Sequence, residues 1–179
     1  MNRLHEKYQK KIAPELMKDL GLSNIMIVPR LKKIVVNSGI GKFRDDKTAI
    51  DSFVQELAAI TGQKPSARKA RLSEAGFKIK RGDLVGVCVT LRSERMWAFL
   101  DKFVNVVLPR VKDFKGLKVG SLDGAGNFSV GIEDHMVFPE VNPNITKSIR
   151  QLQVTAVVQS TDKRGALALL KALGMPIKE

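Results

Sequence analysis

A glycine-containing segment near the start of the chain is the first place where residue types suggest chemistry. Residues 37–43 read Asn-Ser-Gly-Ile-Gly-Lys-Phe, and glycines followed by a lysine are typical of loops that hold a phosphate. A P-loop requires G-x-x-x-x-G-K and then Ser or Thr, whereas Phe43 follows Lys42 here. The third glycine of a dinucleotide fingerprint is also absent. A nucleotide-dependent enzyme that uses Gly39 to Lys42 is therefore the alternative hypothesis, and a turn leaving a strand is the preferred interpretation.

The remaining nucleophiles and possible metal ligands do not form a set. Cys88 has no histidine near it in the sequence, and a reactive thiol needs a base and an electropositive pocket. His135 lies between Asp134 and Met136 at an expected strand end, where we expect a surface residue. One cysteine and two distant histidines are too few ligands for a zinc site. We expect no catalytic residue, no metal and no cofactor.

The strongest chemical signal is a basic segment that leads into a two-faced strand. Residues 64–81 contain one acid, Glu74, and the following bases: Lys64, Arg68, Lys69, Arg71, Lys78, Lys80 and Arg81. In the expected strand at 84–92, valine and leucine alternate with small or polar residues: Gly86, Cys88, Thr90 and Arg92. Because side chains alternate along a strand, its two faces differ in kind. The segment predicts a surface for a polyanion rather than a pocket for a small-molecule substrate.

The overall composition supports a polyanionic partner. The chain has 31 Lys and Arg against 18 Asp and Glu, a formal net charge of +13, which favours nucleic acid or an anionic membrane. No apolar run approaches the ~20 residues that span a bilayer. A membrane-surface protein needs a basic amphipathic helix, and the first helix, the only candidate, carries Glu6, Glu15 and Asp19. With a lone cysteine and no signal peptide, we expect a cytoplasmic protein with no membrane partner.

Apolar residues recur at helical spacing in four segments of one predicted domain, residues 1–179. The expected boundaries are Leu4 to Gly21, Asp45 or Asp46 to Gly62, Ser93 to Pro109, and Thr161 or Asp162 to Gly174. At these ends Asp, Ser or Thr is the expected N-cap, and Gly or Pro is the expected stop. Pro14 lies inside the first helix and cannot donate a helical hydrogen bond, so we expect two helical pieces there.

Four strands are predicted at 31–38, 84–92, 128–133 and 152–159, with a short edge strand at 64–68 and a long loop at 110–127. Each of the four has one aliphatic face, which predicts an α+β fold whose largely antiparallel sheet is covered by helices on one face. The other face would be polar and would collect Lys33, Asn37, Thr90 and Arg92. Without aromatic residues for stacking, such a face suits shaped, partly paired RNA.

Six blocks of sequence are distinctive as a set and cover nearly the whole chain. They are VPRLKKIVVNSGIG (28–41), TGQKPSARKA (61–70), AGFKIKRGDLVGVCVTLR (75–92), ERMWAFLDKFVNVVLPRVKDFKGL (94–117), GNFSVGIEDHMVFPE (126–140) and VTAVV (154–158). In this order they closely resemble the bacterial large-subunit ribosomal protein L5 family. The resemblance implies a non-enzymatic ribosomal protein that binds 5S ribosomal RNA and anchors it in the central protuberance, near 23S ribosomal RNA.

The resemblance also implies which residues contact which partner. The 5S rRNA contacts fall on Asn37, Gln63 and Thr90, with Lys33, Lys64 and Arg92 as neighbours. Residues 70–82 form a basic loop, expected to be mobile, that approaches the peptidyl-site tRNA through Arg71, Lys78, Lys80 and Arg81. Residues 110–144 resemble the loop-rich region that reaches small-subunit ribosomal protein thirteen and forms a bridge to the small-subunit head.

Overall fold

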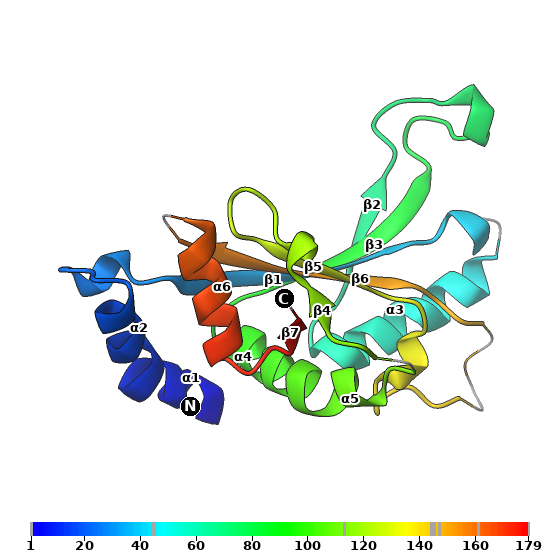
Figure 1. Ribbon diagram of the computed structural model, residues 1–179. Coiled ribbons are helices and arrows are strands. Elements are labelled where there is room, and N and C mark those ends of the chain that lie inside the picture. Colours follow the sequence, from blue (N-terminus) through cyan, green and yellow to red (C-terminus); the bar gives the residue numbers. More distant parts are fainter. Residues whose placement is uncertain are drawn as a thin grey trace. The chain divides into compact units, whose positions relative to one another are not determined.

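A five-stranded antiparallel sheet with the order β2-β3-β1-β6-β5 is the main feature of the computed structural model (Figure 1). The structure describes residues 2–43, 46–112, 114–143, 146, 148–160 and 162–178. The strands are β1 (Arg30–Gly39), β2 (Ser66–Lys69), β3 (Leu84–Leu91), β5 (Phe128–Ile132) and β6 (Leu152–Gln159). These strands confirm the four predicted ones, and β2 lies within two residues of the predicted edge strand. The combination of this sheet with helices confirms the α+β prediction.

Burial alternates along two of the long strands, as the aliphatic pattern predicts. On β1, Ile34 and Val36 are fully buried, whereas Asn37 is exposed. β6 follows the same rule, with Val154 buried and Gln153 exposed. β3 differs, because Cys88, on its small and polar side, is only 8% exposed. The small and polar side of β3 therefore exposes less surface to solvent than its sequence suggests.

Contacts group the chain into two compact units. The first contains residues 1–34, 91–130 and 154–179, and the second contains residues 35–90 and 131–153. The boundaries fall inside the long strands, so each unit combines segments that are distant in the sequence.

The first unit contains two long helical segments that each include a proline. The N-terminal helical segment consists of α1 (Arg3–Lys7) and α2 (Ala13–Asp19), joined by a π-helical turn at Tyr8–Ile12. The second consists of α4 (Ser93–Lys102) and α5 (Leu108–Arg110), joined by a π-helical turn at Phe103–Val107. The two segments are in contact, because the His5 ring stacks on Trp97 with 5.0 Å between centroids. The Arg3 guanidinium also donates two 3.0 Å hydrogen bonds to the Asp101 carboxylate.

The π-helical turns correct two of the predicted boundaries. The backbone stays helical from Arg3 to Asp19, so Pro14 does not separate two helices, and the second segment continues through Pro109 to Arg110. In each case the turn ends two residues before the proline. A proline ring meets the carbonyl four residues earlier in a regular helix, and the wider turn relieves this contact. The structure accommodates each proline rather than ending the helix.

The N-cap predictions have different outcomes. Asp46 caps the helix α3 (Lys47–Thr61), and Asp162 caps α6 (Lys163–Ala172), each by accepting a backbone N–H bond. The alternatives Asp45 and Thr161 lie outside the described residues. Ser93 is not a cap, because the N-cap position belongs to Arg92 and no side-chain bond forms there. Gly62 ends α3 with φ +66°, a left-handed conformation that glycine adopts without strain.

A small second sheet lies in the first unit, and one of its two strands falls within the predicted loop at 110–127. Strand β4 (Leu117–Lys118) pairs in parallel with β7 (Ile177–Lys178) at the C-terminus. Further along this segment, Asp123 accepts hydrogen bonds from the side chain and backbone of Asn127, and these bonds lower the pKa of the Asp123 carboxyl. The two strands were not recognised in the sequence because two-residue strands have no detectable alternation.

Two strand glycines form a matched test of close packing. A Cβ atom at Gly86 would lie 2.9 Å from the backbone oxygen of Ser38, whereas one at Gly131 would meet nothing within 4 Å. We therefore expect Gly86→Ala to lower the free energy of unfolding by about 1–3 kcal/mol through overpacking. Gly131→Ala should change it by less than about 0.5 kcal/mol. Urea unfolding of both variants checks this, and equal stability of the two would contradict the close approach at Gly86.

Candidate nucleic-acid interface

The second unit brings together two of the residues expected to contact 5S rRNA. The Gln63 amide donates from Nε2 to the backbone oxygen of Thr90 at 3.4 Å. Gln63 reaches this position because α3 ends at Gly62. The buried Thr61 hydroxyl supports the helix end, because it lies 2.7 Å from the carbonyl oxygen of Leu57 and 3.0 Å from that of Gln63. The α3 C-terminus thus places the amide of Gln63 beside β3.

Asn37 lies on β1, the strand next to β3 in the sheet, and in the same unit as Gln63 and Thr90. Its side chain is exposed, and Thr90 is half-buried, so both belong to the less buried side of their strands. Amide and hydroxyl groups both donate and accept hydrogen bonds, so together the three side chains can match the donor and acceptor pattern of a shaped RNA.

The expected cationic neighbours are divided between the units. Lys64 follows Gln63 and is exposed, so its charge lies next to this group of polar residues. Lys33 and Arg92 belong to the first unit, where Lys33 is half-buried and Arg92 is exposed. The structure therefore groups Asn37, Gln63, Lys64 and Thr90 in one unit but not the whole predicted set.

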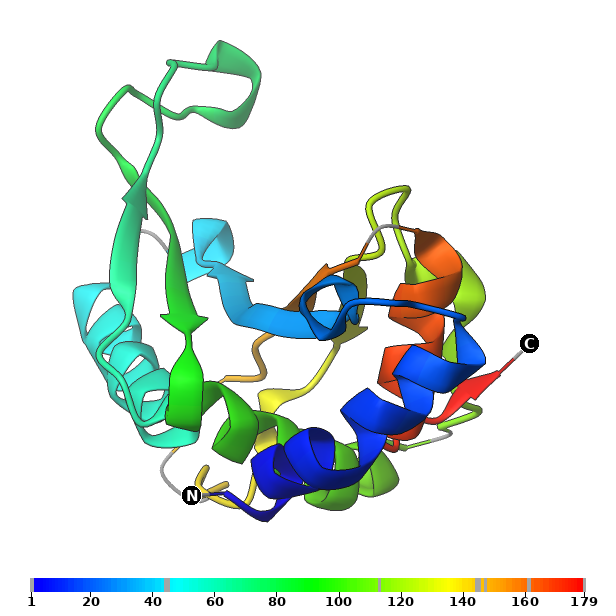
Figure 2. The same ribbon diagram turned by 90° about the vertical axis from the view of Figure 1, so that its left-hand side faces the viewer.

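The basic loop, residues 70–82, is the outer part of the hairpin between β2 and β3. Figures 1 and 2 show this hairpin extending well beyond the strands that form its base. Glu74 and Ile79 exchange two backbone hydrogen bonds of 2.9 and 3.1 Å, and the Asp83 carboxylate accepts from the backbone N–H of Lys80 at 2.9 Å. The loop therefore has hydrogen bonds of its own. The mobility expected for it stays a prediction.

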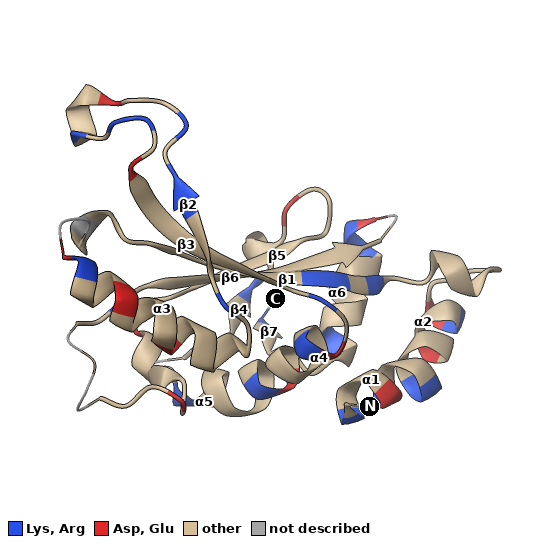
Figure 3. Ribbon diagram, turned by 180° about the vertical axis from the view of Figure 1, so that it is seen from behind, with Lys and Arg blue, Asp and Glu red and all other residues tan. Residues whose placement is uncertain are grey.

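Every base of the segment 64–81 is exposed: Lys64, Arg68, Lys69, Arg71, Lys78, Lys80 and Arg81. Figure 3 shows Lys and Arg at several places along the β2–β3 hairpin, where acids are few. Asp83, one of those acids, is used as a hydrogen-bond acceptor for the loop backbone. The four residues expected to contact tRNA, Arg71, Lys78, Lys80 and Arg81, thus lie on one projecting basic element.

The described residues after β1, 40–43 and 46–61, do not form a phosphate loop. A short 3₁₀ turn at Gly41–Phe43 follows the strand, and α3 begins only at Lys47. The Asp46 carboxylate occupies the N-terminus of this helix, accepting from the N–H of Ala49 at 3.0 Å. A phosphate at a helix N-terminus uses these same N–H groups, and a carboxylate there would repel it.

The structure corrects the prediction that His135 is a surface residue, because the His135 side chain is fully buried. Its Nδ1 accepts the backbone N–H of Arg150 at 3.1 Å, so Nε2 carries the proton and donates to Glu56 Oε2 at 3.0 Å. The sequence could not reveal this pair, because Glu56 and His135 are 79 positions apart. The pairing joins the residues after β5 to α3.

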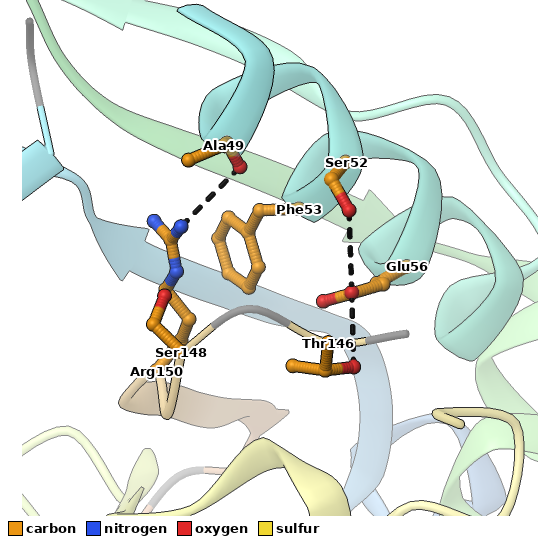
Figure 4. Close-up of a pocket in the computed structure, with 7 residues that line it drawn as sticks. All are labelled: Ala49, Ser52, Phe53, Glu56, Thr146, Ser148 and Arg150. Carbon is orange, nitrogen blue, oxygen red and sulfur yellow. Dashed lines mark hydrogen bonds between the residues drawn. The ribbon is translucent and has the colours of Figure 1, made fainter. Parts of the chain in front are cut away.

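Thr146 and Arg150 complete the polar group around Glu56 (Figure 4). The Thr146 hydroxyl donates to the second Glu56 oxygen at 3.1 Å. The Arg150 guanidinium lies 3.9 Å from the Phe43 ring centroid, donates to the Ala49 carbonyl, and has its pKa lowered by burial. The hollow among these side chains has no room for a water molecule. This cluster therefore holds His135, Thr146 and Arg150 against α3.

Comparison with known proteins identifies the family. The model described as "Ribosomal protein L5" matches residues 24–80, and a second model, which describes the C-terminus of the same ribosomal protein family, matches residues 84–177. The proteins called large ribosomal subunit protein uL5 in Fusobacterium nucleatum, Geobacter sulfurreducens and Rubrobacter xylanophilus are 49%, 47% and 46% identical to this chain. Each alignment covers 99% of this chain and 97–99% of the relative. The chain belongs to the ribosomal protein L5 family.

Membership of the L5 family makes the chain a ribosomal protein with a structural role and not an enzyme. The resemblance found in the sequence blocks is thereby confirmed. Within the described residues, no group of three possible metal ligands is present, and no helix is long and apolar enough to cross a membrane.

The cluster around His135 gives a stability prediction for this L5 family member. Glu56→Ala leaves the buried His135 N–H without an acceptor and should lower the free energy of unfolding by about 1–3 kcal/mol. Glu133→Ala, an exposed glutamate two residues before His135, is the matched control and should change it by less than about 0.5 kcal/mol. Thermal or urea unfolding measures both, and a neutral Glu56→Ala would show that this bond does not stabilise the fold.

Proposed function

We propose that this chain is a constituent of the large ribosomal subunit that binds 5S rRNA and holds it in the central protuberance, beside 23S rRNA. The observation that carries the proposal is the contact between Gln63 and Thr90. Asn37 lies on β1, the strand next to β3, and the exposed Lys64 follows Gln63 in the chain. These are residues at which the family resemblance implies 5S rRNA contacts. The relatives named above, called large ribosomal subunit proteins, support the assignment to that subunit.

Two kinds of contact would divide the work of binding. The cations, led by Lys64, displace counterions from phosphates and supply affinity that depends on salt. Asn37, Gln63 and Thr90 supply hydrogen bonds whose geometry depends on the shape of the RNA. Because Gln63 is already held against the Thr90 carbonyl, its amide is positioned before RNA arrives, and less conformational entropy is lost on binding.

Substitution of Asn37 or Thr90 tests the 5S rRNA surface. Asn37→Ala or Thr90→Ala should each weaken binding to 5S rRNA by about 1–3 kcal/mol, because a polar group of the RNA loses its partner at the interface. Gln55→Ala, at an exposed amide on α3, is the control and should bind as the unaltered protein does. Filter binding with purified 5S rRNA measures all three.

The same binding assay at rising salt separates the two kinds of contact. The slope of log affinity against log salt should be unchanged in Asn37→Ala and smaller by roughly one in Lys64→Ala. A flat salt response would contradict the electrostatic account. Full affinity in both Asn37→Ala and Thr90→Ala would mean that the 5S rRNA lies on another surface.

We further propose that the hairpin loop, residues 70–82, contacts the peptidyl-site tRNA through Arg71, Lys78, Lys80 and Arg81. Support comes from the exposure of all four cations on a projecting element. The region 110–144 would reach small-subunit ribosomal protein thirteen and form the bridge to the small-subunit head. In the second unit, the bonds of His135 to Glu56 and Arg150 would hold part of this region in place.

A triple substitution separates the loop from the 5S rRNA surface. Lys78→Ala, Lys80→Ala and Arg81→Ala together remove three cations and should reduce tRNA occupancy of the peptidyl site in reconstituted ribosomes, while 5S rRNA binding stays within about twofold. The charge-matched control replaces Lys10, Lys11 and Lys18, which are exposed on the N-terminal helical segment. Equal tRNA occupancy in the two triple variants would contradict the proposed loop contact.

A further inference from the structure

Two large apolar side chains are exposed in the basic hairpin loop. Leu72 is 82% exposed and Phe77 is 76% exposed. Among the large apolar side chains that are exposed in the described part of the chain, Phe77 is the one aromatic. Large apolar groups are unfavourable in water, so their presence on a projecting element indicates a surface that another molecule covers.

The backbone holds Phe77 in a defined position at the end of the loop. Phe77 ends a 3₁₀ turn, Ala75–Phe77, that lies between the paired residues Glu74 and Ile79. The N–H of Lys78 closes this turn on the Ala75 carbonyl at 3.0 Å. Lys78 adopts φ +53°, a left-handed conformation that is unusual for a residue with a side chain. The turn therefore gives the backbone at Phe77 a defined conformation, from which the exposed side chain extends into solvent.

The surroundings of Phe77 select the chemistry of its partner. The same loop carries Arg71, Lys78, Lys80 and Arg81, all exposed, against the single acid Glu74. Such an excess of cations favours a polyanion, and a flat apolar ring among them favours a polyanion that also offers flat apolar faces. Nucleic acid bases have such faces, whereas sulfated sugars do not. RNA that exposes an unpaired base or the end of a stacked helix satisfies both requirements.

We propose that the Phe77 ring stacks on an exposed base of a folded RNA whose phosphates the loop cations hold, with Leu72 adding apolar contact. This inference rests on the proposed contact of the loop with tRNA. It adds a recognition element, because phosphate contacts do not distinguish one RNA surface from another, whereas a stacking ring requires an accessible base. The aromatic contact missing from the sheet surface would thus be made at the hairpin loop.

Tryptophan fluorescence tests the stacking directly. The chain contains a single tryptophan, Trp97, which is only 4% exposed, so the unaltered protein supplies the background signal. In full-length Phe77→Trp, folded tRNA should quench the new emission, because a base stacks on the indole. Heparin, a polyanion without bases, should bind to the loop without this quenching.

Affinity measurements give a second readout that does not depend on the reporter. Phe77→Ala should weaken tRNA binding by roughly 5- to 150-fold, the range expected for loss of one stacked base. Phe77→Tyr retains the ring and should bind as the unaltered protein does. Because the side chain is exposed, all Phe77 variants should unfold at the unaltered temperature, which excludes misfolding as the cause.

The outcomes separate this inference from the proposed tRNA contact. If Phe77→Ala binds tRNA normally and tRNA does not quench the emission of Phe77→Trp, the stacking proposal is overturned. A loss of tRNA binding in the triple cation variant would then still support the phosphate contacts. If the triple cation variant also binds normally, the tRNA contact itself is overturned. A blue shift of Phe77→Trp emission with anionic phospholipid vesicles, without a response to tRNA, would assign the ring to a membrane surface and overturn stacking.

Discussion

Burial of one aliphatic side of the central sheet is the constraint on which the other features of this protein depend. Ile34 and Val36 on β1 and Val154 on β6 are almost completely removed from water, and the apolar side of α3 is buried in the same way. Side-chain alternation then leaves Asn37 and Gln153 on the less buried side. A shift of one residue in the pairing register of a strand would move its buried side chains to the other side of the sheet. The hydrophobic free energy that stabilises the sheet therefore also sets the positions of the polar residues.

The two proposed RNA-binding surfaces have different kinds of support within the second unit. Gln63 and Thr90 are held by the end of α3 and by a strand inside the sheet, which suits contacts that must keep their geometry. The hairpin loop is supported by its own backbone bonds and by edge strand β2, whose four residues are all exposed. Arg68 and Lys69 on β2 also protect this edge from pairing with another chain. One continuous segment, residues 63–90, thus contains both the Gln63–Thr90 contact and the projecting hairpin loop.

The environment of His135, which sequence reasoning misjudged, is made by distant parts of the chain. His135 follows a strand and is flanked by polar Asp134, so it was expected at the surface. Its ring is buried because Glu56 and the backbone of Arg150 satisfy both of its nitrogens. Pro14 was expected to divide a helix and Pro109 to end one, yet the helical backbone continues through both, with a π-helical turn before each proline. The stacking of His5 on Trp97 joins these two helical segments.

By itself, the sequence determined the strands of the main sheet, the basic segment 64–81 and the family, because each of these depends on local periodicity, charge or residue identity. It also limited two helix caps to adjacent pairs of candidates, Asp45 or Asp46 and Thr161 or Asp162. Only the tertiary structure decided the contact of Gln63 with Thr90, the burial of His135 and the exposure of Phe77 at the hairpin loop. These features depend on which distant residues meet and which side chains nothing covers. An apolar residue in a sequence is expected to be buried, and only the fold shows which one remains exposed.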